Sequence, residues 1–537
     1  MICHNIKAAA RGSGALGAGV GRAIVISERA TRACRPIGRW APLAAVLAGL
    51  TVASCAAGPN FKRPAPPPVK TYSKAPLTPT VAAPGIVGGE SQRLAMGADL
   101  SGDWWTLFQS RQLDALVGAA LKNNHDLKAA QAALTAARET TLAQRGAFFP
   151  SVSAGFAASR QRQSGALAPT PNNNAFQYSL YTPQLSIAYA PDVFGLTRRT
   201  VENAQAQAEA ARFQMIAAHL TLTTNVVNAA IQEASLRAQI DATRQLVEIG
   251  SKALEIVKYQ HDKGYSSGLD IAAQESQLAQ ARAALPPLLK QEEQQQHLLA
   301  VLTGQYPSQA PDALFELSGL SLPADLPVSL PSALVEERPD VRMAEANLHA
   351  ASAQVGIAAA NRLPNIQLTA AAGNTALAFE QLFGPGTPFW TLGAEITQPI
   401  FQGGALLHQS RAAKAAYVQS AEQYRSTVLG AFQNVADTLS AIQRDAEALK
   451  ASAAAESAAR TTLELSERQV RDGYASYLSL LTAQQAYQQA RLDLVQAQAN
   501  RFADTAALYQ ALGGGWWRRP ELAGANMKTD DGVGRRP

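Results

Sequence analysis

The stretch Asn225-Val226-Val227-Asn228 decides the fold, because it recurs 209 residues later as Asn434-Val435-Ala436-Asp437. The same shift superimposes Gly264-Tyr265 on Gly473-Tyr474. Self-similarity at a fixed separation is the sequence signature of a reused structural unit. Residues 121–511 therefore contain one unit written twice.

A second repeated block contains the first strand candidate of each copy. At a shift of 214 residues, Pro150 aligns with Pro364 without a gap. In the first copy the proline follows a predicted helix over 113–146. In both copies apolar and polar residues alternate directly after the proline, over 151–156 and 365–370, as in a half-buried strand.

Each copy then continues with a second strand and a very long helix. Residues 184–191 and 395–399 are the second strand candidates, and each is followed by a phenylalanine. Apolar residues recur every three or four positions over about 197–262 and 405–471, which predicts two helices of roughly 100 Å. Each copy therefore reads helix, strand, loop, strand, long helix, tight turn and return helix.

Four strands in one chain predict an oligomer if they lie in a membrane. Open strand edges in lipid leave backbone groups unpaired, at a cost of several kcal/mol each. Three chains of four strands give a twelve-stranded barrel, within the range that leaves a lumen. The predicted fold class is a mixed α/β membrane protein, internally duplicated, with long helices and a transmembrane β-barrel formed by a trimer.

The positive charge of the chain is concentrated at its N-terminus. Seven of the 47 basic residues and one of the 41 acidic residues lie in 1–54, which leaves 40 of each in the remainder. A neutral mature chain gives no support to nucleic-acid binding, although the whole sequence has a net charge of +6.

Residues 1–54 have the order of an export signal. A basic stretch is followed by the apolar run 41–50 and by Val52-Ala53-Ser54-Cys55, which resembles a bacterial lipobox. This motif predicts a covalent lipid on Cys55; the alternative is a cysteine beside an ordinary cleavage site. The Pro-rich residues 55–100 are predicted to form an extended, lipid-anchored tether.

The lipobox, the segment Cys55 to Pro64, the duplication and the Gly-Tyr turns together resemble the TolC-type outer-membrane factor family, in its lipoprotein branch. The resemblance implies a homotrimer in the outer membrane and a helical tunnel across the periplasm. It also implies a periplasmic adaptor and an inner-membrane pump, expected to be of the RND type. The predicted domains follow in chain order: a first repeat, an equatorial linker, a second repeat and a C-terminal tail over 101–304, 305–332, 333–512 and 513–537.

In that family the tunnel closes where the long helices turn back. The resemblance assigns the gate to the second turn, with Leu478 as an apolar ring. The acidic positions of the family fall on Ser479 and Thr482, so this chain departs from the acidic pattern. In the first copy, Asp270 occupies the position equivalent to Ser479. Three roles are possible for Asp270: a cap of the return helix, a contact with the adaptor, or a salt bridge.

The two Gly-Tyr pairs are predicted to shape the turns over which an adaptor docks. Gly264 and Gly473 are expected to supply positive φ, and Tyr265 and Tyr474 are expected to pack against the turns.

Catalytic and metal-binding motifs are not recognisable. The seven histidines include no pair at ligand spacing, and no nucleophile elbow or phosphate loop occurs. We therefore expect no enzyme and no cofactor beyond the lipid. The leading hypothesis is a passive conduit for small-molecule or drug export. Protein secretion of type I, metal efflux and a structural periplasmic coiled-coil lipoprotein are the alternatives.

Overall fold

The computed structural model describes residues 56–524 apart from 75, 163–176, 311–314 and 473. Cys55 and Gly473 therefore lie outside the described residues. The α-helices of the described residues are α2 (Arg111–Asn123), α3 (His125–Arg145), α4 (Leu196–Asp262), α5 (Gly268–Leu302), α6 (Pro331–Glu337), α7 (Pro339–Ala360), α8 (Ala405–Arg471), α9 (Tyr477–Ala511) and α10 (Pro520–Ala523). The strands are β1 (Arg93–Met96), β2 (Ser151–Arg162), β3 (Gln177–Tyr189), β4 (Asp325–Val328), β5 (Asn365–Asn374) and β6 (Pro388–Thr397).

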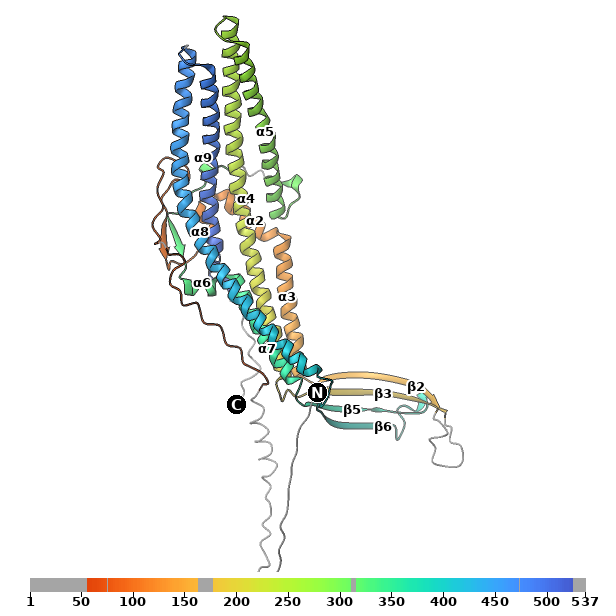
Figure 1. Ribbon diagram of the computed structural model, residues 1–537. Coiled ribbons are helices and arrows are strands. Elements are labelled where there is room, and N and C mark those ends of the chain that lie inside the picture. The colour runs from red at the N-terminus through yellow and green to blue at the C-terminus, as the bar shows by residue number, and fades with distance from the viewer. Residues whose placement is uncertain (1–55, 75, 163–176, 311–314, 473, 525–537) are drawn as a thin grey trace, which may run out of the picture. The chain divides into compact units, whose positions relative to one another are not determined.

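The duplication is visible in the order of these elements. Helix α3 leads through β2 and β3 to α4 and α5, and α7 leads through β5 and β6 to α8 and α9. Helices α4 and α8 have 67 residues each, and α5 and α9 have 35 each. Figure 1 shows α4 beside α5 and α8 beside α9. The predicted long helices and the duplicated element order are confirmed.

The four longer strands form one antiparallel sheet in the order β2-β3-β5-β6. Its register aligns apolar positions across all four strands, since Val152 pairs with Ile187, Ile187 with Ala370, and Ala370 with Leu392. Directly paired residues point to the same side of a sheet. One face is therefore apolar, and the predicted alternation is confirmed.

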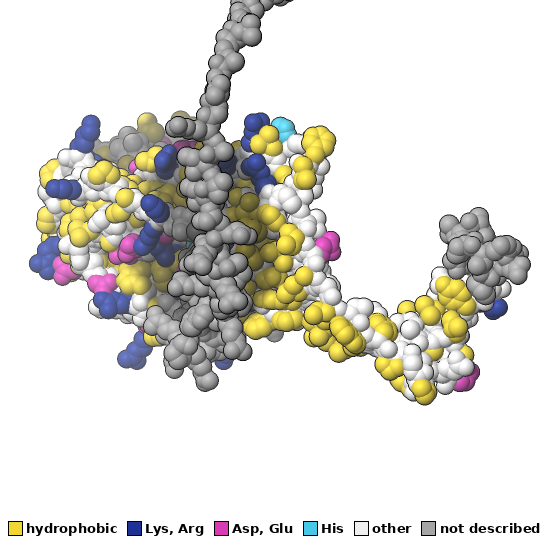
Figure 2. Space-filling model, turned by 90° about the horizontal axis from the view of Figure 1, so that it is seen from below, with side chains coloured by type: hydrophobic (Ala, Val, Ile, Leu, Met, Phe, Trp, Pro, Cys, Tyr) yellow, Lys and Arg dark blue, Asp and Glu magenta, His cyan; other side chains and the backbone are white. Residues whose placement is uncertain are grey.

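The opposite face of the sheet is mostly polar or small, with Leu180 and Phe389 as apolar exceptions, and charge is rare on both faces. The row next to the apolar one joins Ser153, Ser186, Ala371 and Thr391. The charged residues of the four strands are Arg160, Arg162 and Glu395. Figure 2 accordingly shows mostly apolar and uncharged side chains over these strands. Across the described ranges, no helix has the length and hydropathy needed to cross a membrane.

The predicted single helix over 113–146 is wrong, because it is two helices separated at Asn124. This residue has an extended ψ of 130° and accepts a hydrogen bond from the Leu127 N–H through its side chain (2.9 Å). Its amide also donates to the Leu302 carbonyl at the end of α5 (3.1 Å). A side chain that caps a helix competes with continuation of the preceding one, so the chain breaks here.

The segment after Cys55 is extended, and side chains along it pack against the rest of the chain. The Phe61 ring stacks on His349 with 4.3 Å between centroids, and the Tyr72 hydroxyl donates to the Ser329 carbonyl (2.8 Å). Strand β1 pairs in parallel with β4, so the predicted equatorial linker also contains a strand. Aromatic anchors and strand pairing supply the contacts that the proline content did not reveal.

The largest core lies where the equatorial segments meet the long helices. The 3₁₀ helix η1 (Trp104–Phe108) buries three aromatic rings, and Trp104 stacks on Tyr509 of α9. The core includes residues of α4, α8 and α9 and the segment from Phe315 to Leu322. The described part of the C-terminal tail packs on a separate, smaller core: Trp516 of η7 (Trp516–Arg518) and Leu522 of α10 lie against Leu134 of α3 and Phe213 of α4.

Candidate functional site

The first inner turn joins α4 to α5 through a glycine-dependent helix end. Gly264 has a φ of 80°, which confirms the prediction of a positive value. Its N–H donates to the His261 carbonyl (2.8 Å), and the Tyr265 N–H donates to the Gln260 carbonyl (2.8 Å). This is the Schellman arrangement, which satisfies the last carbonyls of a helix and reverses the chain.

Asp270 closes the other side of the same turn by capping α5. Its Oδ2 accepts hydrogen bonds from the Ser267 N–H (2.9 Å) and hydroxyl (2.8 Å), and its own N–H donates to Ser267 Oγ (3.3 Å). The backbone hydrogen bond from Ser267, followed by the serine hydroxyls, lowers the pKa of Asp270. The capping hypothesis is confirmed as a capping box.

The described residues of the second turn, which exclude Gly473, have an equivalent helix-ending hydrogen bond but no carboxylate in the place of Asp270. The Tyr474 N–H donates to the Gln469 carbonyl (2.8 Å), in the same relation as Tyr265 to Gln260. At the start of α9, the Ser479 hydroxyl donates to the Ser476 carbonyl (2.5 Å) and no side chain caps the helix. The first turn of α9 therefore lacks the negative charge that stabilises the first turn of α5.

The start of α9 divides into an exposed stripe and a buried stripe. Leu478 is 71% exposed, and Ser479 and Thr482 are exposed beside it. The Thr482 hydroxyl donates to the Leu478 carbonyl (3.0 Å), so these two residues lie one helical turn apart on the same face. Three of the four residues predicted for the gate thus lie together on one accessible surface, whereas the fourth, Asp270, lies in the other turn at the start of α5.

The buried stripe of α9 joins the four helix ends and was missed in the sequence. Tyr477, Leu480 and Leu481 pack with Val257 of α4 and Leu463 of α8. The Tyr477 hydroxyl has no hydrogen-bond partner among the described residues. Burial, followed by the charge of Asp270, raises the pKa of Tyr477. The spacing 477, 480, 481 and 484 is the signal that identifies this stripe.

The prediction that Tyr265 and Tyr474 pack against the turns is wrong. Their side chains are 85% and 86% exposed. Backbone hydrogen bonds already hold both turns, and both tyrosines lie just past the last helical turn, where no neighbouring side chain covers them. Two exposed aromatic rings at equivalent positions leave a surface available to a partner.

The described residues of these turns offer no group of side chains suited to bind a metal ion. Over the described ranges, no three His, Cys, Asp or Glu side chains are grouped closely enough to hold a metal ion.

The model of the outer membrane efflux protein family matches two ranges of the chain, residues 116–305 and 330–514. The chain belongs to this family. It is 31% identical over 450 residues to the pyoverdine export outer membrane protein OpmQ of Pseudomonas putida. The aligned region covers 82% of this chain and 94% of that protein. It is 29% identical over 484 residues to the toluene efflux pump outer membrane protein TtgF of the same species, with coverages of 87% and 95%.

Solved channel structures have the same fold. The outer-membrane channel OprN has a TM-score of 0.76 and 25% identity, over 86% of this chain and 100% of that one. The open state of the Neisseria gonorrhoeae MtrE outer membrane channel has a TM-score of 0.73 and 26% identity, with coverages of 86% and 99%. The resemblance drawn from the sequence is confirmed, and the chain is an efflux channel protein of the outer membrane.

Proposed function

We propose that three copies of this chain form a closed channel, which is a passive conduit of a tripartite efflux system. The observation that most strongly supports a closed channel is the four-stranded sheet. Its apolar row is continuous across the strands from Val152 to Leu392. Its outer strands, β2 and β6, each pair with one neighbour within the chain. Lipid cannot satisfy such edges, so pairing of β6 with β2 of the next copy gives a closed twelve-stranded barrel.

The long helices supply the periplasmic part of the proposed channel. At 1.5 Å per residue, α4 and α8 with 67 residues each span roughly 100 Å. The inner turns at their far ends present Tyr265 and Tyr474 to a periplasmic adaptor. An inner-membrane pump, expected to be of the RND type, would supply the energy for export, and the chain itself is not expected to be an enzyme.

The proposed substrates are small organic molecules. Two relatives are named for pyoverdine export and for toluene efflux, and both are small-molecule systems. The alternatives are that the same scaffold serves type I protein secretion or metal efflux. A structural coiled-coil lipoprotein is disfavoured, since it would need no sheet with a continuous apolar face.

The lipid anchor on Cys55 is part of the proposal. The Ala57 N–H donates to the Phe194 carbonyl (2.9 Å), and Ala56 lies against Gly195, where an added Cβ would meet the Ala56 Cβ at 2.7 Å. The chain is therefore held where β3 gives way to α4. If the sheet spans the membrane, this position brings an acyl chain on the preceding Cys55 to the lipid surface.

The direct test combines assembly, conductance and export. The purified protein should run as a heat-modifiable trimer and conduct ions in a planar bilayer. Deletion of the gene should sensitise cells to toxic small molecules, and the wild-type gene should restore resistance. A monomeric protein without conductance, or unchanged sensitivity to every pump substrate, would contradict the proposal. Mass spectrometry of the N-terminal peptide separately reports the lipid, and a Cys55→Ser variant is its control.

A further inference from the structure

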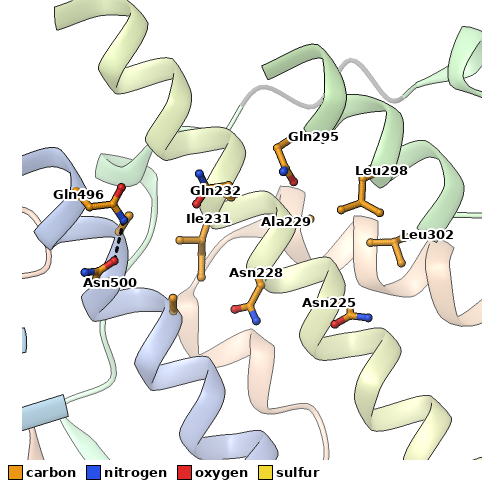
Figure 3. Close-up of a pocket in the computed structure, with 12 residues that line it drawn as sticks. Asn225, Asn228, Ala229, Ile231, Gln232, Gln295, Leu298, Leu302, Gln496 and Asn500 are labelled. Atoms are coloured by element: carbon orange, nitrogen blue, oxygen red, sulfur yellow. Dashed lines mark hydrogen bonds between the residues drawn. The ribbon is translucent and has the colours of Figure 1, made fainter. Parts of the chain in front are cut away.

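A groove of about 470 Å³ runs along α4 between α5 and α9. Figure 3 shows side chains from all three helices converging on it. Its polar lining consists of side-chain amides alone: Asn225, Asn228, Gln232, Gln295, Gln496 and Asn500. None of its lining residues is charged or aromatic, and its apolar edge on α5 is formed by Leu298 and Leu302.

These amides retain unused hydrogen-bonding capacity. Asn228 Oδ1 is buried and has no partner among the described residues. In Figure 3 one hydrogen bond joins the residues drawn, from Gln496 Nε2 to Asn500 Oδ1 (2.8 Å). Each amide side chain offers two donors and one acceptor, so the groove can both donate to and accept from a ligand. A buried acceptor without a partner costs free energy, and rotation of the Asn228 amide toward the groove would let a bound hydroxyl or amide recover it.

The groove lies on the side of α4 that the equatorial segments leave uncovered. On the covered side, the buried Glu233 accepts a hydrogen bond from the Phe315 N–H (3.1 Å). Leu317 packs into the same core as Ala234 of α4. Because the equatorial segments would surround the tunnel wall, the uncovered side of α4 faces the lumen. This step rests on the closed channel proposed above.

We propose that this groove is a transient binding site for uncharged, amphiphilic molecules rich in hydroxyl and amide groups. The amides of α4 and α9 bind the polar groups, and Leu298 and Leu302 contact an apolar edge. A charged ligand finds no counter-ion here, so neutral molecules are preferred. Neutral hydrogen bonds in contact with lumen water are weak, which suits a conduit that must release what it binds.

The probe is N,N′-diacetylchitobiose, a neutral molecule with hydroxyl groups, two acetamides and apolar methyl groups. Its matched control is chitobiose, in which two cationic amines replace the acetamides. Binding is measured by saturation-transfer NMR on the detergent-purified trimer, and by transient blocks of ion current in a bilayer. Both use about 1 M salt, where the Debye length falls to about 3 Å. The neutral sugar should bind at least about fivefold more tightly than the dication, since only the dication carries uncompensated charge into the groove.

The variant Asn228→Leu with Gln232→Met keeps side-chain volume and removes two amides. It should weaken binding of the neutral sugar about tenfold, as expected for the loss of two neutral hydrogen bonds. Gln207→Met, an exposed position of α4 outside the groove, should leave binding unchanged.

Equal binding by the double variant, or by the charged sugar, overturns the groove assignment. A trimer that conducts but binds neither sugar also overturns it and leaves the proposed channel standing. A protein without trimer or conductance overturns the channel, and the lumenal site falls with it.

Discussion

Arg199 Nε donates to the Ala57 carbonyl at 3.0 Å, although these residues are 142 positions apart. The same guanidinium donates to Asn60 Oδ1 (2.8 Å) and to Glu202 Oε2 (2.6 Å). It is 4% exposed, so the segment following the predicted lipid site is fastened by a buried cation. One side chain of α4 therefore fixes the position at which the chain would enter the lipid surface.

Replacement of Arg199 by methionine should release this segment. The variant keeps most of the side-chain volume and removes every hydrogen bond of the guanidinium. Hydrogen exchange in a peptide covering residues 56–63 should become at least about tenfold faster, because removal of a buried charge-assisted bond costs about 1.5–3 kcal/mol. Arg411→Met, at an exposed position of α8, is the control. Unchanged exchange in the Arg199 variant would contradict the fastening role.

The two inner turns should exchange their stabilities when their caps are exchanged. Ser479→Asp places a carboxylate where Asp270 forms its capping box, and should stabilise the start of α9 by about 0.5–2 kcal/mol. Asp270→Ser should weaken the start of α5 by a similar amount. Hydrogen exchange of the first turn of each helix measures both effects. The pKa of Asp270 is lowered in the fold, so its contribution is present at neutral pH and is lost as the pH falls through that lowered pKa.

Most of the fold that could be predicted from the sequence was predicted from the internal repeat. Pro150 and Pro364 mark where helices give way to strands, and the long helices lie within one residue of their expected bounds. Local signals of this kind arise within a few neighbouring residues, so a single sequence contains them.

Contacts between distant residues account for what the sequence did not reveal. Phe61 lies in a Pro-rich segment that reads as a tether, and its packing depends on His349, which is far away in the chain. The break at Asn124 depends in part on the Leu302 carbonyl. The exposure of Tyr265 follows from how far the helix ends project, which periodicity does not encode. The gate residues came from the family resemblance, and their role in gating stays a prediction.

Tyr477→Phe should not destabilise the helix ends, and should stabilise them by up to about 1 kcal/mol. The Tyr477 hydroxyl is buried without a partner among the described residues, and an unsatisfied buried hydroxyl costs about 1–3 kcal/mol. Hydrogen exchange at the start of α9 and the apparent Tm check this result. Tyr474→Phe, at an exposed ring, should change neither quantity. A loss of stability on Tyr477→Phe would mean that the hydroxyl has a partner in the assembled channel.

His219 should make stability fall in moderately acidic solution. Burial, followed by the charge of Arg519, lowers the pKa of His219 to about 4, whereas Asp103 opposes the shift. Between about pH 6.5 and 4 the unfolded chain is protonated at this residue and the native chain is not, so acid favours unfolding. The loss across this window is roughly 3 kcal/mol, at 1.36 kcal/mol per pH unit. His219→Gln should flatten the dependence of apparent Tm on pH, whereas a curve identical to that of the wild type would contradict the assignment.

Leu478→Ser should raise the open probability of the channel if Leu478 forms the apolar ring of the gate. Leu478 is exposed at the start of α9, and hydrophobic constrictions restrict ion flow by excluding water. Leu269→Ser is the matched control, because Leu269 is the equivalent residue of the first copy and is also exposed. Thr482→Asp would add one carboxylate per chain on the same face, so it should increase selectivity for cations. Single-channel recordings separate the two effects, since open probability reports the apolar ring and reversal potential reports the added charge. If neither Leu478→Ser nor Thr482→Asp changes the recordings, the constriction lies elsewhere, and the buried stripe of Tyr477, Leu480 and Leu481 becomes the place where helix movement would have to begin.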